Sequence, residues 1–243
     1  MPASAAIVII GNEILSGKVK DENFHFLAKE LRGLGVALRF AALVPDDVEE
    51  IARVIKEYSD KCDFVFTSGG VGPTHDDVTM KGIARAFGLR TVPNERMREN
   101  IIKHCGYKPS EVVLRMAELP EGALLIDTDG MNFPPVLVKN VYIFPGIPEF
   151  LRKKFNAIKE RFRGEKPYHL KLFYLNEEEC CIAEALETVA GEFGGVEIGS
   201  YPKIGEKDFK VMVTLESRDE EALSGAAGKL LALLPPHVVV RVG

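Results

Sequence analysis

Short apolar runs alternate with amphipathic segments over the first two-thirds of the chain. The runs at 5–10, 36–44 and 63–67 have the length of strands, and the first of them, "AAIVII", has no polar position, as expected for a strand buried on both faces. Each run is followed by a segment in which apolar residues recur every three or four positions, which is typical of a helix with one buried face. This alternation predicts parallel strands joined by helical crossovers.

The same spacing predicts which helical residues face the core. In the first helix Phe24, Leu27, Leu31 and Leu34 are expected on the buried face. Further along, two helices precede three strands with the sequences "ALLID", "PVLV" and "VYIF", and one more helix follows them. These later helices are expected at 94–105, at 110–118 and after Pro148. The predicted fold class is therefore α/β, with a mostly parallel sheet in a three-layer αβα arrangement.

After the charged stretch "KERFRGEKP" the order of elements changes. The remaining segments read as strand, helix, strand, strand, helix and strand, which is the order of a ferredoxin-like α+β domain. We therefore expect two domains, a nucleotide- or phosphate-binding domain at 1–165 and a small βαββαβ domain at 166–243.

Composition excludes several classes of protein. The net charge of −5 over 243 residues argues against a general nucleic-acid binder, which usually carries clustered basic side chains. No apolar stretch reaches the roughly 18 residues of a membrane span, so no membrane association is expected. The four cysteines show no CxxC spacing, which favours reduced thiols in the cytoplasm. The adjacent pair Cys180 and Cys181 is expected to be buried.

The segment "TSGGVGPTHDDVT", at 67–79, directly follows a predicted strand. Glycines at the carboxyl end of a parallel strand let the backbone approach an anion, and the next helix offers unpaired N–H groups to a phosphate. The segment matches neither a P-loop nor the dinucleotide fingerprint. Its candidate phosphate ligands are the glycines Gly69, Gly70 and Gly72 and the hydroxyl donors Thr67, Ser68 and Thr74. The alternative is a tight turn in which Asp77 only caps the next helix.

Acidic residues follow each of the first three predicted strands. They are Glu13, the pair at 46–47 and the pair at 76–77. Magnesium-type ions take one or two carboxylates together with substrate phosphates, so these positions suit metal-assisted phosphate chemistry. The alternative for "DDVEE" is a capping box at the start of a helix, in which Asp46 or Asp47 pairs with the glutamate three residues later.

Four segments, "IVIIGNEILSGKVKDEN", "VPDD", "TSGGVGPTHDDVT" and "FPGIP", occur in this order. Together they resemble the molybdopterin-binding domain family, which includes molybdenum-cofactor biosynthesis proteins and the N-terminal domains of CinA-type proteins and eukaryotic-type FAD synthases. The resemblance covers residues 5–160. The tail, with "GSYP" before "FKVMVTLES", resembles the extension found in the CinA and FAD-synthase branch, where we expect the chain to belong.

By position, the resemblance implies that Asp46 and Asp77 are the active-site acids and hold a divalent metal ion, Mg²⁺, Mn²⁺ or Co²⁺. It also implies that the glycine loop holds phosphate and that the "FPGIP" turn lies beside the ligand. With the hydroxyl and acidic positions above, the expected phosphate- or nucleotide-binding residues are Gly11, Glu13, Asn23, Thr67, Ser68, Gly69, Gly70, Gly72, Thr74, Asp76, Pro145 and Gly146. No bound organic cofactor is expected.

The chain departs from the family pattern at two places. It has Asn12 where the family usually has aspartate, and "GMNFPP", at 130–135, replaces a glycine-containing turn of the type "GTAPG". The second change removes a glycine where a close approach of backbone to ligand is expected.

Three hypotheses for function follow. The first is a metal-dependent nucleotide pyrophosphatase that acts on FAD or ADP-ribose, since the family hydrolyses such linkages or handles adenylylated molybdopterin. The second is a non-catalytic module that binds a pterin or nucleotide, linked to molybdenum-cofactor or FAD metabolism. The third is a scaffold assembled through the small domain. A homo-oligomer, dimer or trimer, is expected because relatives of this kind are usually oligomeric.

Overall fold

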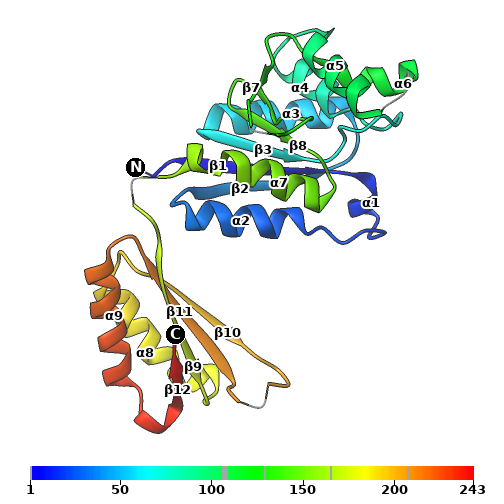
Figure 1. The fold of residues 1–243 in the computed structure, drawn as a ribbon. Helices are drawn as coiled ribbons and strands as arrows, with labels where there is room; N and C mark the ends of the chain where they lie inside the picture. The colour runs from blue at the N-terminus through cyan, green and yellow to red at the C-terminus, as the bar shows by residue number, and fades with distance from the viewer. Residues whose placement is uncertain (1, 106–108, 129, 165, 207) are drawn as a thin grey trace. The chain divides into compact units, whose positions relative to one another are not determined.

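The computed structural model describes residues 2–105, 109–128, 130–164, 166–206 and 208–243 (Figure 1). Its chain divides into two compact units, Met1–Glu165 and Lys166–Gly243. Each unit has a hydrophobic core of its own. Among the described residues no helix is both long and apolar enough to cross a membrane.

The first unit is built on a six-stranded sheet with the order β2-β1-β3-β8-β7-β6. The first four of these strands run parallel, and β7 and β6 continue the sheet antiparallel. The predicted, mostly parallel sheet is thus confirmed. The bounds are β1 Ser4–Ile10, β2 Ala37–Val44, β3 Phe64–Ser68, β6 Leu124–Leu125, β7 Val136–Val138 and β8 Val141–Phe144.

Helices cover both faces of this sheet. Ala6, Val8 and Ile10 point from β1 into one core, whereas Ala5, Ile7 and Ile9 point into the other, so the apolar run without polar positions is buried on both sides. The helices of the first core are α3 Val48–Lys61, α4 Thr79–Ala86 and α5 Glu95–Cys105, and those of the second are α2 Asn23–Gly33 and α7 Pro148–Ile158.

The core between the sheet and helices α2 and α7 contains an aromatic cluster around Phe66. Its ring packs edge-to-face on Phe162 at 4.9 Å and on Phe155 at 5.9 Å, and all three side chains are fully buried. Such aromatic pairs add about 0.5–1.5 kcal/mol each beyond the area they bury. Because Phe155 lies on α7, this packing fixes the helix that follows the "FPGIP" turn.

Several short elements were not predicted, and two details of the prediction were wrong. Periodicity cannot reveal elements of three or four residues, because one period barely fits in them. The helix expected at 110–118 is a single turn followed by a 3₁₀ turn and a strand, and Phe24 is exposed rather than in the core. The unpredicted or shortened elements are α1 Asn12–Leu15, β4 Thr91–Pro93, α6 Glu111–Leu114, β5 Glu118–Pro120 and the 3₁₀ turns η1 Arg115–Ala117 and η2 Lys159–Phe162.

The second unit has the predicted β-α-β-β-α-β order. Its four strands form an antiparallel sheet with the order β10-β11-β9-β12. Strand β11 alternates strictly, so that Val211, Val213 and Leu215 enter the core. The bounds are β9 His169–Leu175, α8 Glu179–Glu192, β10 Glu197–Pro202, β11 Val211–Ser217, α9 Glu220–Leu233, η3 Pro236–Val238 and β12 Val239–Val242.

The expectation of buried thiols in α8 was wrong. Cys180 and Cys181 lie in the first turn of the helix and both are exposed, with their sulfur atoms 3.9 Å apart. The buried positions of α8 are Ile182 and Val189 instead. Adjacent residues of a helix point in different directions, and here neither cysteine points into the core.

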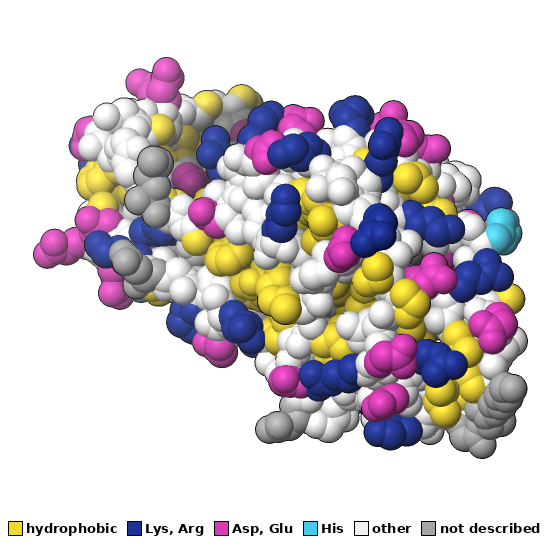
Figure 2. Space-filling view, turned by 90° about the horizontal axis from the view of Figure 1, so that it is seen from above, with side chains coloured by type: hydrophobic (Ala, Val, Ile, Leu, Met, Phe, Trp, Pro, Cys, Tyr) yellow, Lys and Arg dark blue, Asp and Glu magenta, His cyan; other side chains and the backbone are white. Residues whose placement is uncertain are grey.

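Basic and acidic side chains are interspersed over the face of the molecule shown in Figure 2. Apolar side chains lie among them, and the two signs of charge alternate over short distances. The chain as a whole has a net charge of −5. The face shown in Figure 2 has no cluster of basic side chains of the kind that a nucleic-acid binder presents to phosphate backbones.

Candidate functional site at the carboxyl edge of the parallel sheet

The loops that follow the four parallel strands meet at one edge of the sheet. The N–H of Asn12, after β1, donates to Oδ2 of Asp46, after β2, at 2.8 Å. A Cβ added to Gly146, after β8, would lie 3.4 Å from the Cα of Gly69, after β3. This is the edge at which parallel α/β sheets bind ligands. The structure therefore brings together loops that were predicted from separate segments of the sequence.

Glycine is required in the loop after β3. Gly69 has a φ of +106°, and a Cβ there would lie 2.0 Å from the carbonyl oxygen of Ile10. Gly70 has a φ of +62°, and its Cβ would lie 2.3 Å from Oγ1 of Thr79 and 3.5 Å from Oδ1 of Asp46. Residues other than glycine are strained at such positive φ angles, and their side chains do not fit these spaces. The loop backbone can therefore lie against the Asp46 carboxylate.

Thr79 anchors the glycine loop and was not singled out by the sequence. Its side chain is fully buried, its Oγ1 donates to the carbonyl oxygen of Gly69 at 2.9 Å, and its N–H donates to that of Gly70 at 3.0 Å. Helix α4 begins at this residue without a side-chain cap. A threonine at a helix start, on the side that faces a glycine loop, is the one signal that could have indicated this role.

Asp46 and its neighbour Asp47 accept hydrogen bonds from different parts of the chain. Asp47 caps α3, because its Oδ1 accepts from the N–H groups of Glu49 at 3.0 Å and Glu50 at 2.9 Å. The capping box that was the alternative for "DDVEE" does not form, since the Glu50 carboxylate pairs with Arg53 and the Asp47 N–H donates to the carbonyl oxygen of Pro45. Asp46 does not cap the helix: its Oδ2 accepts from the Asn12 N–H and, within the described part of the chain, its Oδ1 accepts no hydrogen bond.

Asp77 closes its own loop rather than capping α4. Its Oδ2 accepts from the N–H of Thr74 at 2.7 Å and from the Thr74 hydroxyl at 2.5 Å, and a Cβ on Gly72 would lie 2.7 Å from it. The Thr74 hydroxyl also lies close enough to the exposed Asp76 carboxyl to lower its pKa. One hydroxyl has one proton, so we assign it to Asp77, which receives the Thr74 backbone as well.

Asn23 and Ser68 form a buried link between loops. The Asn23 amide donates to Oγ of Ser68 at 2.9 Å and to the carbonyl oxygen of Gly146 at 2.7 Å, and the Ser68 hydroxyl reaches the carbonyl oxygen of Pro145. Both side chains are buried, as is that of Thr67. These three side chains lie beneath the loop surface and link the loops, and their direct contact with phosphate stays a prediction.

Glu13 and His75 are exposed at the rim of this edge. The Glu13 carboxylate folds back over Gly11, where an added Cβ would lie 2.5 Å from its Oε1. The His75 side chain is 99% exposed and lies 4.0 Å from the Asp76 carboxylate. Asp76 is exposed too. These three side chains are exposed and can meet a ligand, although Asp76 also interacts with His75 and the Thr74 hydroxyl.

The carboxylates at this edge limit the kind of metal ion that they could hold. Among the described residues no three His, Cys, Asp or Glu side chains converge, so an ion held by the protein alone does not fit. Asp46 and Asp77 each keep an Oδ1 that accepts no hydrogen bond from the described residues. Magnesium-type ions are commonly bound through one or two such carboxylates, with water and substrate phosphate as the other ligands.

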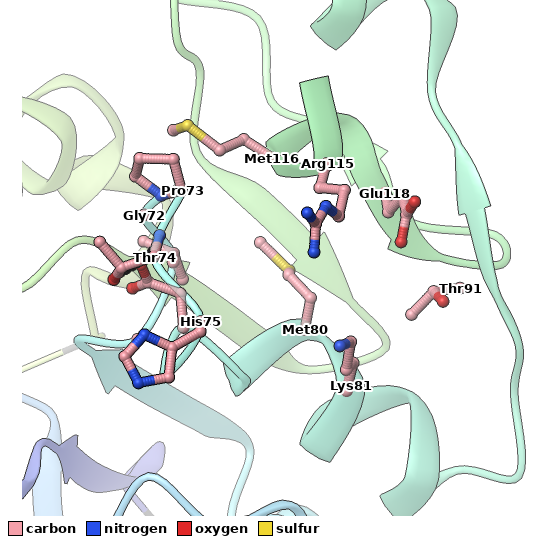
Figure 3. A pocket seen from close by; sticks show the side chains of 13 residues that line it. Gly72, Pro73, Thr74, His75, Met80, Lys81, Thr91, Arg115, Met116 and Glu118 are labelled. Carbon is pink, nitrogen blue, oxygen red and sulfur yellow. Dashed lines mark hydrogen bonds between the residues drawn. The ribbon is translucent and has the colours of Figure 1, made fainter. Parts of the chain in front are cut away.

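A pocket opens beside the glycine loop, on the side of β4 and β5 (Figure 3). One wall is the loop itself, and the opposite wall carries Arg115, Met116 and Glu118 from η1 and the start of β5. Met80 and Lys81 reach the pocket from α4. No sequence pattern indicated Arg115 or Glu118, because they are far from the loop along the chain and belong to elements too short to predict.

Comparison with known proteins places these loops in a family. The model of a family described as "Probable molybdopterin binding domain" matches residues 6–163. The chain belongs to this molybdopterin-binding domain family. The model described as "FAD synthase, middle domain" matches residues 167–243. The branch expected from the sequence, that of CinA-like proteins and FAD synthases, is confirmed by both matches and by the relatives below.

Three relatives illustrate the range of this family. A protein of Archaeoglobus fulgidus is 38% identical over 94% of this chain and 96% of its own length. A "Probable FAD synthase" of Caenorhabditis elegans is 33% identical over 97% of this chain and 51% of its own length. A crystal structure of the protein CinA, of unknown function, from Thermoplasma acidophilum has a TM-score of 0.61 and 28% identity over 66% of this chain and 98% of its own. The chain thus spans about half the length of the FAD synthase it matches.

Proposed function

We propose that the first unit is a hydrolase that cleaves the pyrophosphate bond of a nucleotide such as FAD or ADP-ribose, with a divalent metal ion. Likeness to FAD synthases and CinA-like proteins supports a role connected with nucleotides. The observation that carries the hydrolase proposal is the closeness of Gly70 to Asp46: a Cβ built on this glycine of positive φ would lie 3.5 Å from Oδ1 of Asp46, which accepts no hydrogen bond from the described residues.

Each part of this edge has a task in the proposed reaction. The glycine loop and the uncapped start of α4 present N–H groups to one phosphate. A water oxygen forms a bond to that phosphorus while the bond from phosphorus to the bridging oxygen breaks, which yields two monophosphates. The free Oδ1 of Asp46 or Asp77 orients this water and accepts its proton. A metal ion held by the same two carboxylates would neutralise phosphate charge.

The second candidate function is a module that binds a nucleotide or pterin without turning it over. It is supported by the hydrogen bonds of Asp77, both of which come from its own loop, and by the altered turn at 130–135. In this alternative the carboxylates shape the loop and do no chemistry. The expected homo-oligomer remains a prediction in either case.

The test is product analysis after incubation with FAD or ADP-ribose and Mg²⁺, Mn²⁺ or Co²⁺. We expect the wild-type protein to release AMP and Asp77→Asn to be at least about 100-fold slower, since a lost charge at the reacting phosphate is worth several kcal/mol. Asp60→Asn is the matched control, because it removes the same charge from an exposed residue of α3 that pairs with Lys56 and lies outside the proposed site. Binding without AMP release under every metal would overturn the hydrolase in favour of the module.

A further inference from the structure

The pocket beside the glycine loop is lined by two cationic side chains, Lys81 and Arg115, for which the described residues supply no ion-pair partner. Within the described residues, neither the Lys81 nor the Arg115 side chain takes part in an ion pair or hydrogen bond, although both reach the pocket. Neighbouring arginines behave differently: Arg85, one turn further along α4, pairs with Glu49 at 3.0 Å, and Arg90 pairs with Glu121 at 3.3 Å.

The two cations lie where a ligand would extend from the glycine loop. In Figure 3 the Arg115 guanidinium points into the space opposite Thr74, with the Met80 side chain between the two walls, and the Lys81 ammonium lies below it. A guanidinium offers a planar fork of donors that matches a phosphate, and an ammonium adds a point charge. The pocket therefore suits a ligand with a second anionic group beyond the one at the loop.

The rest of the lining favours an organic ligand over free phosphate. Met80, Met116 and Val71 contribute apolar surface, and methionine side chains adapt to irregular shapes. Pockets of this composition, apolar with a few placed polar groups, are typical of sites for small molecules. Glu118 lies on the same wall as Arg115 and would repel an anion that passed beyond the guanidinium.

We propose that Lys81 and Arg115 are specificity-determining residues that bind the second phosphate of a pyrophosphate-linked substrate while the glycine loop binds the first. This inference rests on the proposed function, because it assigns the substrate class of the same site. It makes the site selective for diphosphate linkages over nucleoside monophosphates, which would reach the loop but leave both cations without a partner.

The test separates this selectivity from catalysis. Binding of ADP-ribose and of AMP is measured by calorimetry in EDTA, where metal-dependent turnover cannot occur, for the wild-type protein, Lys81→Gln, Arg115→Gln and the double variant. We expect the double variant to lose about 10- to 100-fold in affinity for ADP-ribose, as for lost charge-assisted hydrogen bonds, and less than about threefold for AMP. Thermal melts verify that each variant is folded.

Arg85→Gln is the matched control, since it removes a cation from the same helix outside the pocket. If it weakens ADP-ribose binding as much as Lys81→Gln does, the effect is general electrostatics and the inference is wrong. Equal losses for AMP and ADP-ribose, or no binding of ADP-ribose by the wild-type protein, would also overturn it. Selective loss of ADP-ribose binding in a protein that never releases AMP would uphold the inference and reject the hydrolase.

Discussion

The glycines of the loop after β3 and Gly228 of helix α9 have different surroundings. Gly69 and Gly70 have positive φ angles, and any Cβ there would overlap the Ile10 carbonyl oxygen or the Thr79 hydroxyl. Gly228, within α9, would place a Cβ in open space. The first unit therefore uses glycine to bring backbone close to other loops, whereas the second contains a helical glycine that its packing does not require.

This difference shows how the two units depend on sequence. In the second unit, period-two and period-3.6 patterns are enough to set the elements, and each core residue is replaceable by a similar apolar one. At the carboxyl edge of the first unit, individual atoms of residues far apart in the chain must fit within a few tenths of an ångström. Substitutions matched between the two units should therefore have unequal effects.

The largest expected effect is that of Gly69→Ala. A Cβ 2.0 Å from the Ile10 carbonyl oxygen, at a φ of +106°, forces the loop away from β1, and we expect a loss of about 2–4 kcal/mol in the free energy of unfolding. Gly228→Ala is the control and should raise the stability by about 0.5–1 kcal/mol, because alanine favours the helix. Urea denaturation measures both, and equal effects would contradict the contrast.

A smaller effect is expected for the hydroxyl that anchors the loop. Thr79→Val keeps the shape but leaves the Gly69 carbonyl oxygen without its 2.9 Å hydrogen bond, which should cost about 1–2 kcal/mol and weaken binding of ADP-ribose. Ser217→Ala in the second unit removes a comparable bond of 2.8 Å to the carbonyl oxygen of Gly195. It should lower stability similarly but leave ADP-ribose affinity unchanged, as calorimetry would show. A loss of affinity in both variants would mean that general destabilisation, and not the loop, weakens binding.

The long, periodic elements could be predicted from the sequence, and the contacts between loops could not. The unbroken apolar run of β1 and the alternation in β11 each set a buried surface through local spacing alone. The glycines and acidic residues that follow the strands were identified as candidate ligands from local sequence too, because they stand directly after predicted strands. Whether Asp46 or Asp47 caps α3 depends on backbone angles at one residue, and the role of Arg115 depends on a tertiary contact with no local pattern.

Asp46 and Asp47 give the most direct test of the account, because they are adjacent, identical in chemistry and different in contacts. The rate of AMP release from ADP-ribose is measured for Asp46→Asn and Asp47→Asn, together with their urea denaturation. We predict that Asp46→Asn loses at least about 100-fold in rate with little change in stability, whereas Asp47→Asn keeps most of its rate and loses up to about 1 kcal/mol of stability with its helix cap. Equal rates in the two variants, or the larger loss in Asp47→Asn, would contradict the assignment of Asp46 to the chemistry at this edge of the sheet.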